Sequence, residues 1–346
     1  EAGNPAEPTC TDVAYTAKRL VRGLASSRDG ARQGFGAALV DVLRTFPTVQ
    51  PEDVLTIMEE AMVLSGSVHG AEERDILFGR VFTCSVLLRS GRLAALPAPR
   101  RTALATHIAR ELAFCSTKKS FLQEPCSVLL CDLMDTLSLG DVQTALLPQI
   151  APLLSAPLSE WSAHALLYAL RLSHKLPLAA LRALLPHVSL PVFSVSNMPA
   201  LVAPLKAASA AHPRVHAVWD DIFAHGLVKT AAADGAPASV DDGLLRVFWQ
   251  TVVEEGLVPS TLERKYLSFN LLQRALTSLT PSQVPHLLSP ALLKTLVNAL
   301  EGTDRLLQPV ATATLQTLSR AAEQSSTLRP ALVSGLLGRG KVGGTD

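Results

Sequence analysis

The polar and apolar positions of this chain recur with the period of an α-helix along nearly its whole length. Apolar residues in the stretch 13–24 stand at i, i+4, i+7, i+8 and i+11, and the stretch 35–46 repeats that spacing after a polar break. Such spacing places apolar side chains on one face of a helix. Because no convincing run of period-two alternation is present, the pattern predicts helices and no sheet.

Sixteen helical segments are predicted in this way, separated by short polar or proline breaks. They span residues 12–25, 31–46, 52–64, 72–90, 100–115, 118–137, 141–153, 159–173, 177–186, 198–209, 212–230, 241–256, 260–277, 281–287, 290–301 and 304–323.

Several of these segments carry residues that favour a helix start. Ser260 with Glu263 and Thr280 with Gln283 fit the capping box, in which two side chains bond to unpaired backbone N–H groups. Pro290 stands at a first helical position, where its missing N–H costs nothing. These starts agree with the segment boundaries predicted from periodicity.

The first two segments form a predicted helical hairpin. The break at 26–29 offers side-chain oxygens that can accept hydrogen bonds from the start of the second helix. Gly30, Gly34 and Ala38 follow at i, i+4 and i+8 and form a strip without bulk. We expect the two helices to pack closely along that strip.

The length of 346 residues exceeds the size at which a single core usually keeps growing. Aromatic residues make up only 5% and charged residues 18%, which favours stacked helices over a sheet. The sequence ALLP at 145–148 returns at 183–186, an offset close to the period of HEAT and armadillo repeats. The sequence therefore predicts an all-α fold, an α-solenoid of HEAT/armadillo-like repeats.

Two stretches break the helical pattern more than the others. The alanine-rich, aspartate-containing stretch 231–243 is predicted to be a loop or inter-lobe joint, and the proline-rich stretch 186–204 is a second place for one. The predicted organisation is an N-terminal helical-repeat lobe at 1–230, the joint, and further repeats at 244–346. The chain begins at Glu1 without methionine or a signal segment, so we expect a fragment of a longer protein.

Net charge, hydropathy and cysteine content limit the partners and the cellular compartment expected for this chain. The formal net charge is +1, so any contact with nucleic acid has to come from a local patch. Mean hydropathy is +0.27, but the longest stretch without a charged residue, 183–205, contains four prolines, and we expect no membrane span. Five cysteines without a C-x-x-C pair are typical of buried, reduced thiols in the cytosol or nucleus.

Five blocks of the sequence carry a family resemblance: residues 17–46, 73–91, 118–125, 212–223 and 248–273. The first reads AKRLVRGLASSRDGARQGFGAALVDVLRTF and the last FWQTVVEEGLVPSTLERKYLSFNLLQ. Together they resemble the N-terminal portion of the Myb-binding protein 1A / DNA polymerase V (polymerase phi) family.

The resemblance implies a non-enzymatic nucleolar scaffold of HEAT-like repeats that acts in ribosome biogenesis and ribosomal RNA transcription. Its implied partners are the preribosomal particle, through protein or precursor RNA, and also ribosomal DNA or transcription factors. One alternative is a transcriptional co-regulator that binds ribosomal DNA or a DNA-binding factor. Another is a karyopherin-like transport adaptor, which shares helical repeats but would lack the five blocks.

The polymerase in the family name calls for carboxylates that hold two metal ions about 4 Å apart. Three pairs qualify by position: Asp220 with Asp221, Asp241 with Asp242, and Asp132 with Asp135. Adjacent residues of a helix point about 100° apart, and no glycine-rich phosphate loop accompanies any pair. The sequence predicts no enzyme, no cofactor and no small-molecule substrate.

A set of histidines and a pair of cysteines are further candidate metal ligands. His212 and His216 stand at i, i+4, with His225 nine residues beyond, and Cys126 and Cys131 share an apolar helix. Neither set offers the full ligand shell of a zinc site, so we interpret both as structural.

Basic residues on helix surfaces are the predicted contact sites for nucleic acid or a partner protein. In the alternative interpretation they solvate helix faces and pair with nearby acids. Aromatic residues beside them are nearly absent from the sequence, which argues against recognition of single strands. The predicted contact residues are Lys18, Arg19, Arg22, Arg28, Arg32, Arg100, Arg101, Lys118, Lys119, Arg264 and Lys265.

Overall fold

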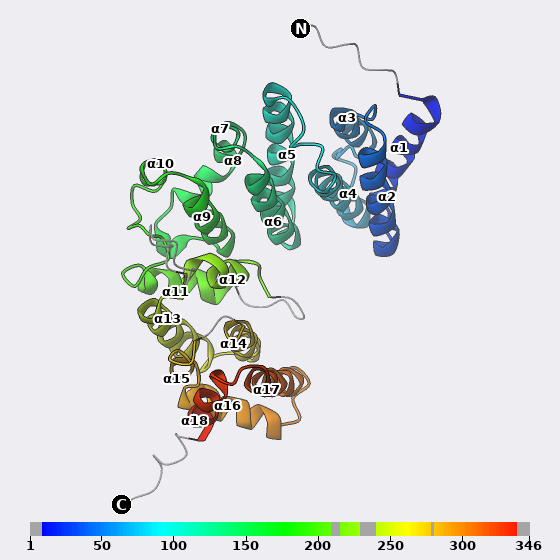
Figure 1. The fold of residues 1–346 in the computed structure, drawn as a ribbon. Coiled ribbons are helices and arrows are strands. Elements are labelled where there is room, and N and C mark those ends of the chain that lie inside the picture. The colour runs from blue at the N-terminus through cyan, green and yellow to red at the C-terminus, as the bar shows by residue number, and fades with distance from the viewer. Residues whose placement is uncertain (1–8, 209–214, 229–239, 278–279, 338–346) are drawn as a thin grey trace, which may run out of the picture. The chain divides into compact units, whose positions relative to one another are not determined.

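The computed structural model describes residues 9–208, 215–228, 240–277 and 280–337. Within these ranges the chain is built from helices, and its only extended pairing is an isolated bridge between Val228 and Val240. The all-α prediction is therefore confirmed (Figure 1). The chain divides into two compact units, Glu1–Pro152 and Leu153–Asp346.

Unit 1 is formed mainly by six long helices, followed by a chain of short helical turns. Its contacts join near neighbours in the sequence, from α1 with α2 to α5 with α6. The elements are α1 (Thr11–Gly23), α2 (Asp29–Thr45), α3 (Pro51–Ala61), α4 (Gly70–Arg89), α5 (Ala98–Lys118), α6 (Ser120–Thr136), α7 (Leu139–Asp141), the π-helical turn η1 (Val142–Leu146), α8 (Leu147–Ile150) and the 3₁₀ turn η2 (Ala151–Leu154), which lies at the division.

The apolar stripes predicted from the sequence form the core of unit 1. Ala17 and Val21 of α1 are buried, and so are Leu39 and Leu43 of α2. Burial of such stripes supplies most of the stability of amphipathic helices, because short helices are marginal in isolation. Gly91, with φ of 74°, follows α4 in the left-handed conformation that favours glycine at a helix end.

The closest helix packing in unit 1 lies elsewhere than the sequence predicted. A Cβ placed on Gly30 or Gly34 would meet nothing within 4 Å, so the predicted strip faces open space and that prediction was wrong. The closest approach is at Gly23 of α1, where a Cβ would lie 2.5 Å from the ring of Phe35 of α2. Another is at Gly79 of α4, where a Cβ would lie 2.8 Å from Sδ of Met62 and 3.0 Å from Cβ of Ala25. Periodicity places a glycine on a helix but does not say which face meets a neighbour.

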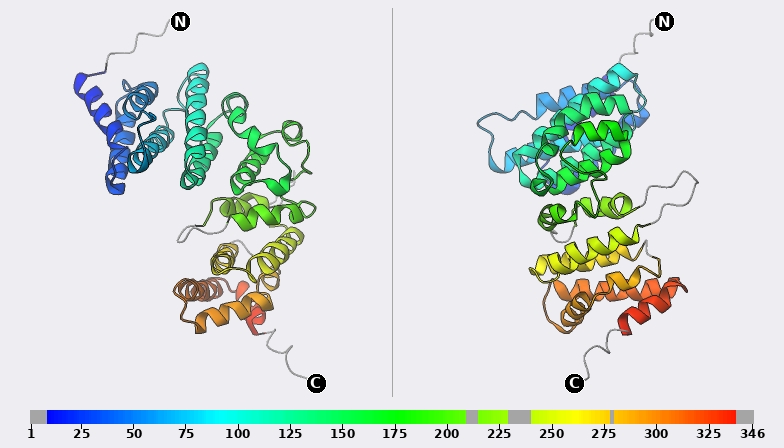
Figure 2. Two further views of the ribbon diagram at one scale, coloured as in Figure 1. Left: turned by 180° about the vertical axis from the view of Figure 1, so that it is seen from behind. Right: turned by 90° about the vertical axis from the view of Figure 1, so that its left-hand side faces the viewer.

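Unit 2 contains shorter helices with more frequent breaks (Figure 2). Its elements are the 3₁₀ turn η3 (Leu158–Glu160), α9 (Ala163–Lys175), α10 (Leu178–Leu184), α11 (Met198–Ala207), α12 (Val218–Asp221), the π-helical turn η4 (Ile222–Gly226), α13 (Asp242–Phe248), the π-helical segment η5 (Trp249–Leu257), α14 (Leu262–Ala275), α15 (Val284–Leu287), α16 (Pro290–Glu301), α17 (Leu307–Gln324) and α18 (Leu328–Leu337).

An aromatic cluster forms the centre of the unit 2 core. The ring of Phe248 lies 5.7 Å from that of Phe193, 6.4 Å from that of Trp219 and 6.5 Å from that of Trp249. All four rings are buried. The indole N–H of Trp219 donates to the carbonyl of Ala208 at 2.9 Å, which satisfies the one polar group it carries into the core.

Most predicted helical segments match observed elements. The segment predicted at 141–153 is instead a series of short turns, and the one predicted at 212–230 lies partly outside the described residues and is helical at 218–226. The helix predicted at 260–277 begins at Leu262 behind Thr261, and the hydroxyl of Ser260 instead accepts from the guanidinium of Arg264. At the segment predicted from 281, the amide of Gln283 accepts from the N–H of Thr280, but the helix begins only at Val284. Helix α18 was not predicted.

Other starts follow the prediction. Ser289 accepts from the N–H of Leu292 behind Pro290 at the first position of α16, and Asp241 accepts from the N–H of Leu244 at the start of α13. None of the described helices is both long and apolar enough to cross a membrane. The predicted joint at 231–243 lies mostly outside the described residues, so the lobe boundaries 1–230 and 244–346 stay a prediction.

Candidate nucleic-acid and partner-binding surface

Helix α1 presents a stripe of charged residues opposite its buried face. Ala17 and Val21 point into the core, while Lys18, Arg19 and Arg22 are exposed. Tyr15 stands one turn before Arg19 and is 63% exposed. The three cations make no hydrogen bond or ion pair with other described residues, so they are available to a partner. We call Lys18, Arg19, Arg22 and the exposed Arg28 the basic ridge.

Arg32, which was predicted to join this ridge, is buried and used internally. Its guanidinium donates to the carbonyl of Ser26 at 2.6 Å, pairs with Asp29 and lies 3.5 Å from a carboxylate oxygen of Asp75. It also lies over the ring of Phe78, 4.6 Å from the centroid. Only 6% of the side chain is exposed, so Arg32 holds the start of α2 against α4.

Arg100 and Arg101 at the start of α5 also have partners inside unit 1. Arg100 pairs with Glu52 at 2.8 Å, and Arg101 pairs with Asp141 at 2.8 Å. Burial raises the pKa of Asp141, but hydrogen bonds from Ser138, Thr102 and Arg101 outweigh it and lower the pKa to about 2. Asp141 therefore stays ionised, and Arg101 serves to join α5 to α7.

The lysines at the corner between α5 and α6 have aromatic neighbours. The ammonium of Lys118 lies 4.6 Å from the ring centroid of Phe114, a cation–π contact. Lys119 pairs with Glu73 at 2.7 Å, and the hydrogen bond from Lys119 is the main cause of the lowered pKa of Glu73. Phe121 follows on the first turn of α6 and is 49% exposed.

The pair Arg264 and Lys265 in unit 2 was predicted to be exposed, but both side chains are half-buried. Arg264 donates to the hydroxyl of Ser260 at 2.9 Å, which fixes it against the start of its own helix. Whether any of the eleven predicted residues contacts nucleic acid stays a prediction. The structure exposes four of them on α1 and just before α2, and it places two at the α5–α6 corner.

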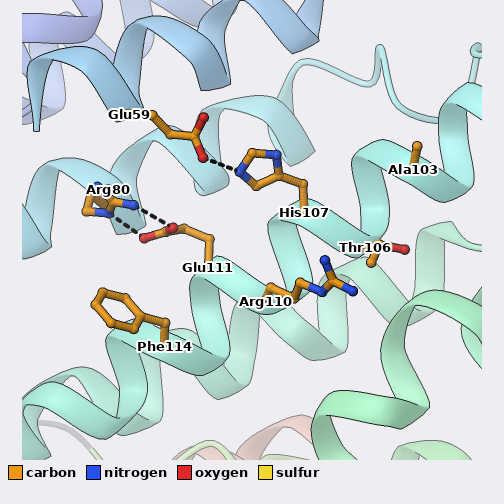
Figure 3. A pocket seen from close by; sticks show the side chains of 8 residues that line it. All are labelled: Glu59, Arg80, Ala103, Thr106, His107, Arg110, Glu111 and Phe114. Carbon is orange, nitrogen blue, oxygen red and sulfur yellow. Dashed lines mark hydrogen bonds and ion pairs between the residues drawn. The ribbon is translucent and has the colours of Figure 1, made fainter. Parts of the chain in front are cut away.

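A hollow of about 570 Å³ opens beside α5, which we call the α5 hollow (Figure 3). At its base Glu111 accepts two hydrogen bonds from Arg80, at 2.5 and 2.8 Å, and Arg80 also donates to the carbonyl of Met62 at 2.7 Å. His107 lies 2.9 Å from Glu59 at one side. Arg110 and Phe114 are exposed on its wall.

A second hollow, of about 500 Å³, lies where the starts of α2, α4 and α6 meet, and we call it the α6 hollow. The rings of Phe78 and Phe121 line it with their centroids 5.5 Å apart. Arg74, 47% exposed and paired with its neighbour Asp75 at 3.2 Å, stands at the same hollow. Ser27, Asp29 and Arg32 complete the lining.

Exposed aromatic residues are the feature that the sequence reasoning missed. Tyr15, Phe114 and Phe121 all stand near cations, so the expected shortage of aromatic neighbours was wrong for these places. The sequence did indicate that these rings lie beside cations. Tyr15 precedes Arg19 by four residues and Phe114 precedes Lys118 by four, and residues four apart on a helix are neighbours. Periodicity alone did not separate these rings from core aromatics.

The carboxylate pairs weighed for metal binding take part in internal contacts. Asp220 pairs with Arg274 and Asp221 with Arg171, each at 2.7 Å. Asp241 caps α13 as described above. In the described part of the chain no three His, Cys, Asp or Glu side chains gather where they could hold a metal ion.

Most of the described histidines and cysteines considered as metal ligands are buried or contact other residues of the fold. His216 and His164 lie 3.0 Å apart through their ring nitrogens, while His212 falls outside the described residues. Four cysteines are buried and Cys10 is exposed, with no disulfide among them. Burial is the main reason why the pKa of the Cys126 thiol is raised to about 12, so this sulfur stays protonated.

Comparison with known proteins identifies the family. The sequence profile of the DNA polymerase phi family matches residues 15–343. The chain is 26% identical to the rDNA transcriptional regulator pol5 of Schizosaccharomyces pombe, over 94% of this chain and 34% of that protein. It is 24% identical to the rDNA transcriptional regulator POL5 of Saccharomyces cerevisiae, over 91% of this chain and 36% of that protein.

Animal relatives match as well. The chain is 29% identical to human Myb-binding protein 1A, over 80% of this chain and 19% of that protein. It thus spans between 19% and 36% of the length of these relatives. Because the family profile covers nearly the whole sequence, the resemblance carried by the five blocks is confirmed, and the chain belongs to the DNA polymerase phi family.

Proposed function

We propose that this chain is the helical-repeat part of a non-enzymatic nuclear scaffold that acts in ribosomal DNA transcription and in ribosome biogenesis within the nucleolus. The observation that carries the proposal is the family match over residues 15–343, together with relatives named as rDNA transcriptional regulators. The preribosomal particle is the proposed partner, bound through protein or precursor RNA.

The architecture supports a scaffold. Each helix of unit 1 packs on its near neighbours in the sequence, as in HEAT and armadillo repeats, and we propose that the chain is an α-solenoid of that type. Stacked repeats offer long surfaces for binding. A non-enzymatic role is supported by the engagement of Asp220 and Asp221 in ion pairs with arginines, which leaves this pair tied to the fold.

The basic ridge supplies a surface suited to phosphate. Its four cations are exposed and make no ion pair with described residues, whereas Arg100, Arg101 and Lys119 are already neutralised by carboxylates. Contacts of lysine and arginine with phosphate position a protein on nucleic acid without reading sequence, and they weaken as salt rises.

A second candidate function is transcriptional co-regulation through direct binding of ribosomal DNA or of a DNA-binding factor. The relatives named Myb-binding protein 1A favour a protein partner of this kind. No observation favours a karyopherin-like transport adaptor, since the matching family is another one.

Crosslinking in cells separates these functions. The tagged full-length protein is crosslinked, and the attached nucleic acid is sequenced. Enrichment of precursor ribosomal RNA supports the preribosomal scaffold, and enrichment of ribosomal DNA promoters supports the co-regulator. Recovery of neither would reject a direct nucleic-acid contact and leave protein contacts alone.

Charge reversal tests the basic ridge. The triple variant Lys18→Glu, Arg19→Glu and Arg22→Glu is expected to weaken preribosome association in a salt-dependent way, because three phosphate contacts become repulsive. Its matched control reverses three exposed cations of unit 2, Lys294, Arg305 and Arg320. If the ridge variant co-sediments with preribosomes as fully as the control does, the ridge is not the contact.

A further inference from the structure

Among the described residues, the exposed phenylalanine and tyrosine side chains all lie in unit 1. Tyr15, Phe35, Phe46, Phe114 and Phe121 are each at least 37% exposed. In unit 2 every phenylalanine, tyrosine and tryptophan is buried or half-buried. Singly exposed apolar residues are common on protein surfaces, so the informative rings are the two that line hollows, Phe114 and Phe121.

Two of these rings occur in hollows that each pair a ring with an exposed arginine, beside carboxylates that have internal partners: Glu59 and Glu111 in the α5 hollow and Asp29 in the α6 hollow. The α5 hollow combines Phe114 with Arg110, and the α6 hollow combines Phe121 with Arg74. Lys118 and Lys119 stand between them in the sequence, at the corner where α5 ends and α6 begins. The pairing of an exposed ring with an exposed arginine is therefore repeated on both sides of one corner.

The rings are held in place by the fold. Phe78 packs against Phe121 at an interplanar angle of 33°, and Arg32 lies over Phe78 in turn. Lys118 lies over the face of Phe114. Phe121, fixed by its packing on Phe78, loses little conformational entropy when a flat ligand stacks on it, which favours binding.

Cations lie beside the rings. Among the described residues, Arg110 is exposed and makes no hydrogen bond or ion pair, and Lys118 makes none besides its contact with the ring of Phe114. Arg74 is 47% exposed and pairs with Asp75, whose carboxylate is mostly buried. A ligand that brings both flat apolar rings and negative charge matches this set.

We propose that unpaired bases of a single-stranded nucleic acid stack on Phe114 and Phe121, with Arg110, Lys118 and Arg74 against the neighbouring phosphates. Stacking on aromatic side chains beside a positively charged track is how proteins bind single strands with little sequence preference. A base on the face of Phe114 displaces the ammonium of Lys118 toward a phosphate. This inference deepens the proposed function, on which it rests, by naming the single strand as the form that is bound.

Binding of labelled oligonucleotides to the 346-residue chain tests the site. The probes are a single-stranded RNA of about 15 nucleotides, within the usual site sizes, the DNA strand of the same sequence, and the RNA duplex. Single strands are expected to bind more tightly than the duplex, in which the base faces are covered. Comparison of the RNA and DNA strands shows which of the two the surface prefers.

Two sets of variants identify the residues. Phe114→Leu and Phe121→Leu keep apolar bulk but remove the flat ring, and each is expected to weaken binding of single strands about 5-fold or more. Phe46→Leu is the matched control, since Phe46 is 39% exposed in the same unit but lines neither hollow. The double variant Arg110→Gln and Lys118→Gln is expected to reduce the slope of log K against log salt by about 1.4.

The proposal is overturned if the duplex binds as tightly as the single strand, or if the Phe114 and Phe121 variants bind like the Phe46 control. It is also overturned if these variants lose protein partners after ribonuclease treatment while they retain single-strand binding, because the surface is then a protein contact. Loss of single-strand binding in the variants, with no precursor RNA or ribosomal DNA crosslinked in cells, keeps the inference and rejects the nucleic-acid contact of the proposed function.

Discussion

Individual residues decide which of the predicted cations can reach a partner. Arg19 and Arg32 both occupy polar positions of the helical pattern. Arg19 is exposed, whereas only 6% of the Arg32 side chain is exposed. The difference comes from α4, which brings Asp75 and Phe78 against Arg32 from 43 and 46 residues away. Contacts that distant leave no local trace in a helical pattern, so the sequence predicts a surface arginine where the fold needs a buried one.

Gly79 shows a residue whose role is close packing. Substitution Gly79→Ala places a Cβ 2.8 Å from Sδ of Met62, which is fully buried and whose carbonyl is held by Arg80. Overpacking of this kind costs about 1–3 kcal/mol, against about 1 kcal/mol gained in helix propensity. We expect a net loss of about 1 kcal/mol, measured by thermal unfolding as a fall of about 2–4 °C in Tm.

Gly34→Ala is the matched control for this prediction. Gly34 lies in α2, and a Cβ there meets nothing within 4 Å. The same substitution therefore gains helix propensity without a clash, and Tm is expected to rise by about 2 °C. Equal effects of the two substitutions would show that Gly79 is not at a close contact.

At the scale of elements, the sequence predicts the boundaries of the helices better than the faces on which they pack together. The stripes at 13–24 and 35–46 give α1 and α2 nearly to the residue, because burial of one face is recorded in the 3.6-residue period. The strip at Gly30 and Gly34 was assigned to the wrong face, since the side on which a neighbour packs is set by α4. The α6 hollow was missed for the same reason, as three helix starts build it.

The packing of α9 on α12 and η4 predicts a dependence of stability on pH. His174 lies against His225 with ring centroids 4.5 Å apart. Burial lowers the pKa of His174 below its usual 6.5, repulsion from His225 and Arg171 adds to this, and Asp221 opposes it. The folded chain therefore prefers neutral His174, and this stability is complete above pH 6.5.

As pH falls below that value, the unfolded chain takes up a proton that the folded chain resists, so stability is lost. We expect the Tm of the transition that includes unit 2 to fall from neutral to mildly acidic pH, and His174→Gln to reduce that fall. His187→Gln is the matched control, since His187 is exposed in the same unit. An unchanged pH profile in His174→Gln would contradict the assignment.

At the scale of the whole molecule, the two units divide aromatic residues between two uses. Unit 2 uses its rings to fill a core around Phe248, whereas unit 1 builds its core from aliphatic side chains and leaves rings at its surface. Average composition conceals this division, because the 5% aromatic content is a mean over both units. The sequence therefore predicted the all-α class and the family but not that the exposed phenylalanine and tyrosine side chains of the described residues lie in unit 1.

Photochemical crosslinking tests that division directly. A stacked base held against an aromatic ring is well placed to crosslink on ultraviolet irradiation, so the 346-residue chain bound to a single-stranded RNA is expected to give crosslinked peptides around Phe114 and Phe121. Mass spectrometry of the digested complex locates them, and the same experiment with an RNA duplex controls for contacts through phosphate alone. Because no phenylalanine, tyrosine or tryptophan of unit 2 is exposed among the described residues, its peptides are expected to carry few crosslinks. Crosslinks concentrated in unit 2 would show that binding there uses side chains other than aromatic ones, and that the exposed rings of unit 1 serve another partner.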